Sequence, residues 1–255
     1  PKKKNHGLPR NPFNSLIVPR PIGWISSVDD KGVANLAPYS FFNAVSYQPP
    51  TVMFSAGAGH ADDRLKDSAR NIEQTGEFVC NLATWETREA MNHSSIAADP
   101  EVDEIELSGL TPIASSLVAP PRIKEAPVHL ECRYLKTVEI PGWSDADRYK
   151  VIFGEVVGVH IDDAVINENG LVDIRKMGVI SRLGYDDYAR IATAFGDSST
   201  VPEINAGRVL DDYGAFHPTH EFLEVLLDHG VDSVVVVDAS PSDRTARAVR
   251  DGTPQ

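Results

Sequence analysis

Apolar and polar residues form short strand-like runs over the first sixty positions of the chain. WISSV, residues 24–28, is followed by DDKG, residues 29–32, and Asp and Gly in a short turn between apolar runs predict a hairpin. YQPPTVMFSAG, residues 47–57, predicts another strand, with Pro49 and Pro50 near its start, where a missing N–H is tolerated. The region therefore predicts strands joined by tight turns.

Two later segments have the spacing of helices. The segment at residues 60–76 predicts a helix that Gly76 stops, and TWETREAMNHSSIA, residues 84–97, predicts a second helix that ends near Asn92 and His93. EFVCNLAT predicts the strand that lies between these two helices.

The clearest strand patterns of the chain lie in two segments, VHLECRYLKTVEI at residues 128–140 and YKVIFGEVVGVHIDD at residues 149–163. The segment between them, PGWSDADR, predicts a loop. The Pro- and Ser-rich segment 101–127 predicts irregular structure. The resulting order, β-β-β-α-β-α-β-β, favours a mainly β antiparallel barrel with α decoration over a doubly wound parallel sheet.

The pattern changes after residue 196, so we divide the chain into a domain at 1–196 and a C-terminal extension at 197–255. The extension reads as linker, helix, short strand and helix, an α/β appendage. Its helix carries an apolar stripe that we expect to pack on the barrel, within one protomer or across a dimer. The stripe consists of Phe222, Leu223, Leu226 and Leu227.

Composition narrows the function. The 255 residues are 42% hydrophobic, which is enough for a sizeable core, and the net charge of −13 argues against binding nucleic acid or an anionic membrane. No apolar run approaches the roughly 20 residues of a membrane span. We expect Cys80 and Cys132 to be reduced core thiols of a cytoplasmic protein.

Several common catalytic motifs are missing from the sequence. Gly57 and Gly59 in SAGAGHADD predict a flexible turn and not a dinucleotide-binding loop. The histidines do not form an H-E-x-x-H motif, and no G-x-S-x-G nucleophile elbow is present. We therefore expect no metal site and assign no catalytic residue.

One stretch, NLAPYSFFN at residues 35–43, fits neither a plain strand nor a plain loop. It brings aromatic rings among hydroxyl and amide groups, and KDS at residues 66–68 opens a helix, where a lysine and a hydroxyl suit a phosphate. Together these residue types suit a planar ring with a phosphate tail, although surface hydroxyls and a solvated lysine explain them as well.

The order of motifs resembles the flavin reductase-like family of FMN-binding split-barrel proteins. PFNSLIVPRPIGWISSVDDKGVANLAPYSFFNAVSYQPPTVMFS matches its first block, and KDSARNIEQTGEFVCNL matches its second, with Ser68 where Thr is commoner. EAMNHSS, PVHLECRY and SRLGYDDYARI match later blocks. The resemblance covers roughly residues 6–195 and not the extension.

The resemblance implies a Greek-key split barrel that forms a homodimer, with FMN bound near the subunit interface. It implies that two serines of the first strand meet the isoalloxazine edge, that the 40–43 segment lines the ribityl chain and phosphate, and that the 66–68 segment closes the phosphate end. Arg20 either reaches the flavin or braces the barrel, and which of Arg182, Tyr185 and Tyr188 approaches the flavin stays open. The implied cofactor-binding residues are Ser26, Ser27, Asn35, Ser40, Phe41, Asn43, Lys66, Asp67 and Ser68.

The family suggests an oxidoreductase that passes hydride from NADH or NADPH to FMN, and then supplies a partner monooxygenase or another acceptor. That chemistry belongs to the cofactor and needs no obligatory acid–base side chain. Two alternatives remain: a flavoredoxin-like electron carrier, and a self-contained FMN enzyme that acts on a small organic substrate.

Overall fold

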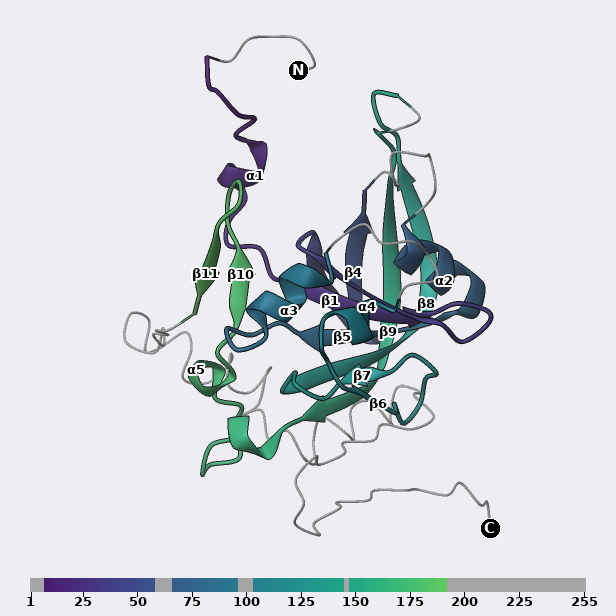
Figure 1. The fold of residues 1–255 in the computed structure, drawn as a ribbon, viewed down its shortest axis with the longest axis vertical. Coiled ribbons are helices and arrows are strands. Elements are labelled where there is room, and N and C mark those ends of the chain that lie inside the picture. The colour runs from purple at the N-terminus through teal and green to yellow at the C-terminus, as the bar shows by residue number, and fades with distance from the viewer. Residues whose placement is uncertain (1–6, 58–65, 96–102, 145–146, 192–255) are drawn as a thin grey trace.

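The computed structural model describes residues 7–57, 66–95, 103–144 and 147–191. Its main feature is a seven-stranded antiparallel sheet in the order β2-β1-β5-β8-β9-β4-β3 (Figure 1). The strands are β1 (Gly23–Val28), β2 (Ala34–Tyr39), β3 (Phe42–Tyr47), β4 (Pro50–Ala56), β5 (Glu77–Leu82), β8 (Val128–Ile140) and β9 (Tyr149–Ile161).

The sheet curls into a barrel, because its two edge strands are consecutive in sequence. β2 and β3 lie at opposite ends of the strand order, yet only Ser40 and Phe41 separate them. The Ser55 N–H, at the end of β4, donates a hydrogen bond of 2.8 Å to the Phe41 carbonyl, which fixes this two-residue link against the sheet. The expected antiparallel barrel is confirmed.

The predicted helices are present but shorter. α2 (Asp67–Thr75) ends at Gly76, whose φ of 80° is the left-handed conformation that glycine adopts at a helix end. Its Ala69 and Ile72 are buried against the barrel core. α3 (Arg88–His93) is the second predicted helix and ends at the predicted residue.

The core of the described residues consists of clusters on both faces of the sheet, since β1 buries consecutive side chains. Phe54 and Phe78 fill the centre of one cluster, and Trp24 lies in a second cluster at the α3 side, fully buried as expected for a core residue. Cys80 and Cys132 are buried free thiols, which confirms the prediction that both lie in the core.

The prediction of irregular structure for 101–127 is wrong in part, because three short elements form there. α4 (Glu104–Leu107) begins at Asp103, whose side chain accepts hydrogen bonds from two backbone N–H groups, and β6 (Pro112–Ile113) pairs with β7 (Arg122–Ile123). None of these elements is long enough to produce a periodic pattern.

The last described elements return to the N-terminus. A 3₁₀ turn (Asp163–Val165) and α5 (Ile174–Met177) lead to a hairpin of β10 (Ile180–Arg182) and β11 (Tyr188–Arg190), which lies beside α1 (Phe13–Leu16) (Figure 1). The backbones of Arg20 and Arg182 exchange hydrogen bonds of 2.9 Å in both directions. None of the helices in the described ranges is both long enough and apolar enough for a membrane span. The predicted extension, with its Phe222 stripe, lies outside the described residues.

Candidate functional site

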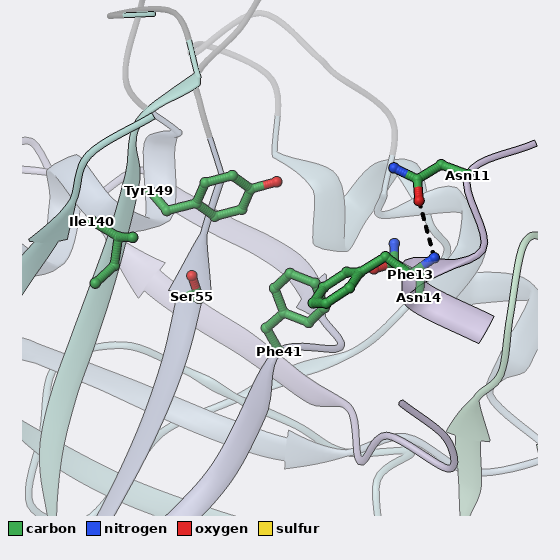
Figure 2. A pocket seen from close by; sticks show the side chains of 7 residues that line it. All are labelled: Asn11, Phe13, Asn14, Phe41, Ser55, Ile140 and Tyr149. Carbon is green, nitrogen blue, oxygen red and sulfur yellow. Dashed lines mark hydrogen bonds between the residues drawn. The ribbon is translucent and has the colours of Figure 1, made fainter. Parts of the chain in front are cut away.

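A cavity of about 480 Å³ opens between α1, the β2–β3 link and the start of β9 (Figure 2). We call it the first cavity. Its walls carry three aromatic rings, and its polar side-chain groups are two amides, the Ser55 hydroxyl and the Tyr149 phenol. The lining residues are Asn11, Phe13, Asn14, Phe41, Ser55, Ile140 and Tyr149.

Three apolar side chains of this cavity face water. Phe13 is 57% exposed, Ile140 46% and Tyr149 39%. Ile140 and Tyr149 are paired residues at the ends of β8 and β9, where the predicted loop reverses the chain. The ring of Phe41 lies 6.4 Å from that of Tyr149. The cavity is therefore an open, aromatic-walled groove, within the size range of sites for small molecules.

Arg20 braces the wall beside this groove. Its guanidinium donates hydrogen bonds to the carbonyls of Asn14, Ile17 and Leu183, and its carbon lies 5.8 Å from the Phe41 ring centre. Only 5% of the residue is exposed. Of the two roles left open for Arg20, the structure shows bracing: it ties the N-terminal segment to the loop after β10.

A second cavity of about 340 Å³ adjoins the first one on the other side of the link. We call it the second cavity. All three residues whose position was left open lie here, because Arg182, Tyr185 and Tyr188 line its wall with Arg20 and Ser40. Arg182 donates to the Tyr185 carbonyl at 2.6 Å and lies 4.4 Å from the Tyr188 ring centre.

Tyr185 has an unusual backbone. Its φ of 52° makes it the one residue other than glycine with positive φ among the described residues. The left-handed conformation costs a non-glycine residue about 1–2 kcal/mol. Such strain occurs often at ligand sites, where the surrounding structure holds it. Here the hydrogen bond from Arg182 and the Arg10 guanidinium, 4.7 Å from the ring centre, hold the turn.

Most of the predicted serine and asparagine side chains are buried in the fold. Asn35 of β2 accepts a hydrogen bond of 2.7 Å from the Ser68 hydroxyl and donates one of 3.0 Å to Glu104 of α4. Ser27 donates to the same Asn35 oxygen and accepts from Asn71. We call these five buried residues the interior network. Their exposed fractions do not exceed 8%.

The other predicted residues have different surroundings. Ser26 is fully buried and donates to the Pro121 carbonyl, whereas Asn43 on β3 is exposed. Asp67 forms an ion pair of 2.7 Å with Arg70. Lys66, just before α2, has no ion pair with any described residue. The structure thus brings Ser40 and Phe41 to the cavities and gives Ser26 and Ser68 internal partners, and their contacts with FMN stay predictions.

Two buried glutamates have opposite pKa shifts. Burial is the main cause that raises the pKa of Glu104, although Asn35 and the Leu36 N–H oppose it. Burial also acts to raise the pKa of Glu131, but hydrogen bonds from His160 and from the N–H groups of Ser116 and Leu117 outweigh it and lower the pKa. Each carboxyl accepts three hydrogen bonds that lower its pKa, but the neighbouring charge differs in sign: Asp67 raises the pKa of Glu104, whereas His160 lowers that of Glu131.

Comparisons with known proteins assign the chain to a family. The flavin reductase like domain matches residues 15–179, which is more than half of the chain. The chain belongs to the flavin reductase-like family. An uncharacterized protein of Aquifex aeolicus is 42% identical over 182 residues, with coverage of 71% of this chain and 88% of the other.

Two solved structures relate this family member to the split-barrel fold. Nitrilotriacetate monooxygenase component B from Bacillus cereus is 32% identical, has a TM-score of 0.69, and aligns over 77% of this chain and 96% of its own. A split-barrel domain protein from Shewanella frigidimarina, 23% identical with a TM-score of 0.63, aligns over 72% of this chain and 88% of its own. The barrel seen here is therefore the split barrel of the flavin reductase-like family.

The first cavity fits the cofactor that the family typically binds. A flavin has a flat ring and a polar edge of donors and acceptors, and the first cavity offers aromatic walls beside two amides and two hydroxyls. The described residues contain no cluster of three or more histidine, cysteine, aspartate or glutamate residues that could hold a metal ion.

Asn11, Phe13, Asn14, Ser55 and Tyr149 were not among the predicted site residues. The signal for Phe13, Asn14 and Ser55 was available, because the first matched motif begins with PFN at residues 12–14 and ends at Ser55. Tyr149 gave no such signal, since only the pairing of β8 with β9 and of β9 with β4 brings it to the cavity.

Proposed function

We propose that this protein binds FMN in the first cavity and catalyses its reduction by NADH or NADPH. The observation that carries the proposal is the open groove whose walls are Phe13, Phe41 and Tyr149, in a chain of the flavin reductase-like family. A solvent-exposed aromatic groove of this size is costly unless a ligand or a partner covers it.

The chain's own groups would bind and orient the cofactor. Phe41 and Tyr149 supply apolar surface for a planar ring, and Asn11, Asn14 and Ser55 supply donors and acceptors for its edge. Lys66, at the start of α2, would pair with the phosphate, and the exposed Asn43 would contact the ribityl chain. The interior network would hold β2, which leads into the Ser40–Phe41 link, in a fixed position through the hydrogen bonds of Asn35.

When bound, FMN supplies the hydride-accepting chemistry. The protein's part is to hold a nicotinamide against the open flavin face at roughly 3–3.5 Å and to exclude water from that contact. The exposed fractions of Phe13, Ile140 and Tyr149 leave one side of the groove accessible for this purpose.

We also propose that a homodimer covers part of the groove and that reduced FMN passes to a monooxygenase. Component B of a monooxygenase is 32% identical to this chain, which supports a two-component system. β3, an edge strand, carries the exposed Val45 and Tyr47, which gives a second copy an apolar surface. Sedimentation of the FMN-loaded protein at micromolar concentration tests the dimer, and a monomer that still holds FMN would contradict it.

The deciding experiment uses the purified protein with added FMN. We expect FMN to bind more tightly than riboflavin, and NADH or NADPH, titrated separately, to bleach the visible absorbance of the flavin. Absence of FMN binding would overturn the proposal. Tight FMN binding without oxidation of either nucleotide would favour the electron carrier instead.

The second cavity favours one other candidate, a self-contained FMN enzyme that acts on a small organic substrate. Asn14 lines both cavities, so a second small molecule would lie close to the flavin. Nucleotide oxidation that is slow alone and accelerates with a small substrate would support this candidate over a reductase that releases its flavin.

A further inference from the structure

The second cavity contains two positive charges without a negative partner. Arg20 and Arg182 both line it, and no aspartate or glutamate is among its lining residues. Arg20 donates only to backbone carbonyls and to the Ser40 hydroxyl, and Arg182 donates to the Tyr185 carbonyl. Neither arginine forms an ion pair with a carboxylate in the part of the chain that the structure describes.

Arg10 is the main cause that lowers the pKa of Asp186, and the charge of Arg182 adds to it, so this acid already has another arginine as its main partner. Asp186, in the turn after Arg182, accepts hydrogen bonds of 2.7 and 3.3 Å from Arg10, and it faces solvent with a side chain 78% exposed. Because arginine stays protonated at any physiological pH, Arg20 and Arg182 hold their charges side by side. Burial, and then the charge of Arg182, lowers the pKa of Arg20, as two adjacent cations require.

A buried or half-buried charge is ordinarily paired. Two adjacent guanidinium groups without a carboxylate partner are unusual in an acidic protein with a net charge of −13. A bound anion would offset the repulsion between them. The other lining residues indicate the chemistry of the rest of the ligand that carries this anionic group. Ile22, Pro38 and Met91 supply apolar surface, and Tyr185 and Tyr188 supply rings.

We propose that the second cavity binds a small organic carboxylate with an apolar or aromatic body. Arg182 would bind the carboxylate, because its guanidinium is the less engaged of the two and matches the planar carboxylate with two parallel N–H groups. Arg20 would keep its hydrogen bonds to the backbone carbonyls, and its positive charge would add to the electrostatic attraction of the carboxylate. The proposal rests on the proposed function in one respect: such a carboxylate would be the small molecule that lies beside the flavin.

The cavity's volume supports a small ligand over a dinucleotide. About 340 Å³ is at the lower end of the range for ligand sites, which suits a molecule of the size of benzoate. The Arg182 guanidinium donates a hydrogen bond to the Tyr185 carbonyl, which positions it at the cavity wall before a ligand arrives.

The experiment compares benzoate with benzamide, its neutral analogue of nearly equal shape, by calorimetric titration of the FMN-loaded protein. We expect benzoate to bind about tenfold more tightly than benzamide, because only benzoate can accept charge-assisted hydrogen bonds. Arg182→Gln should weaken benzoate by about tenfold, leave benzamide unchanged, and leave FMN affinity unchanged. Arg182→Lys, which keeps the charge and loses the planar fork, should give an intermediate affinity.

Arg133→Gln is the matched control, since Arg133 is an exposed arginine of β8 that lines neither cavity. It should bind benzoate as the unmodified protein does. Equal affinity for benzoate and benzamide in the unmodified protein, which requires no variant to fold, would overturn the proposal. So would a loss of FMN affinity in Arg182→Gln, which would assign the cavity to the cofactor, or tighter binding of inorganic phosphate or AMP than of benzoate.

The same titrations without FMN separate this proposal from the proposed function. Arg182-dependent benzoate binding in a protein that does not bind FMN would keep the carboxylate site and overturn the flavin reductase proposal. FMN binding with no preference for benzoate would do the reverse.

Discussion

The interior network and the first cavity are built from the same kinds of residue but have opposite surroundings. In the network, Asn35 satisfies Ser27, Ser68 and Glu104 at once, and water is excluded. In the cavity, Asn11 and Asn14 lie beside exposed rings, and the Asn11 oxygen accepts a hydrogen bond from the Phe13 N–H while its amide NH2 group can still donate to a ligand. A polar residue that is fully satisfied inside the fold contributes to stability, whereas one at an open groove contributes to binding.

The largest effect should come from breaking the hub of the interior network. Asn35→Ala leaves the Ser68 hydroxyl without its acceptor and Glu104 without its side-chain donor, which should lower the free energy of unfolding by about 3 kcal/mol. Urea unfolding measures this. Asn43→Ala is the matched control: Asn43 is exposed on β3, and its loss should change stability by less than about 0.5 kcal/mol. Equal destabilisation by both variants would remove the distinction between the two regions.

Lys66→Ala should act on ligand binding alone. A charge-assisted contact with phosphate contributes roughly 1.5–3 kcal/mol, so FMN affinity should fall about tenfold or more while riboflavin affinity stays nearly unchanged. Flavin fluorescence titration measures both affinities. Lys31→Ala, in the exposed β1–β2 turn, is the control and should alter neither. An equal loss for both flavins would move the phosphate site away from α2.

Phe41→Ala tests the aromatic wall. Removing the ring should weaken FMN and riboflavin alike, by about fivefold, because ring contacts of this kind contribute about 0.5–1.5 kcal/mol beyond the area that they bury. The equal effect on both flavins distinguishes the wall from the phosphate end. If Phe41→Ala destabilises the fold as much as Asn35→Ala does, then the ring belongs to the core and not to the groove.

The smallest expected effects are changes in the pH dependence of the free energy of unfolding, and they come from the two buried glutamates. The pKa of Glu104 is raised by burial above its ordinary value of 4.5, so the native state holds its proton more tightly than the unfolded chain does. Relative to Glu104→Gln, the stability of the unmodified protein should therefore fall as pH rises through and above 4.5.

Glu131 should behave in the opposite way. Its pKa is lowered below 4.5 in the native state, so the stability that it contributes is present above 4.5 and is lost as pH falls below that value. Relative to Glu131→Gln, the unmodified protein should be more stable near neutral pH, and the difference should narrow in acid. Urea unfolding of the three proteins over a pH series measures both trends. Parallel curves for all three would mean that neither carboxyl is perturbed.

Turn residues and the alternation of apolar and polar residues made much of the barrel predictable from the sequence. The Asp29–Gly32 turn identified the β1–β2 hairpin, and alternation gave the bounds of β8 and the start of β9. The break between β2 and β3 was not predicted, because a two-residue link has no Gly or Pro to mark it. Elements as short as β6 and β7 are formed by tertiary packing and leave no periodic pattern.

The site was predictable only in part. Ser40 and Phe41 line the cavities, as their place in the matched motif suggested. The same motif could not say that Ser26 and Ser68 point inward, because a hydroxyl suits an internal carbonyl as well as a ligand. Tyr149 lies more than a hundred residues from Phe41, and only the folded sheet brings the two rings to 6.4 Å.

The two-residue link between β2 and β3 restricts how a site of this kind can evolve. A loop at a barrel rim ordinarily changes its ligand through insertions and deletions, since surface connections tolerate changes of length. Here the link has only two residues, and each of them lines a cavity, so an added residue would move Ser40 or Phe41 from its place in the wall. New ligand preferences at this rim would therefore have to arise by exchange of side chains around Ser40 and Phe41, or in the N-terminal segment and the hairpin loops, whose lengths are free to vary.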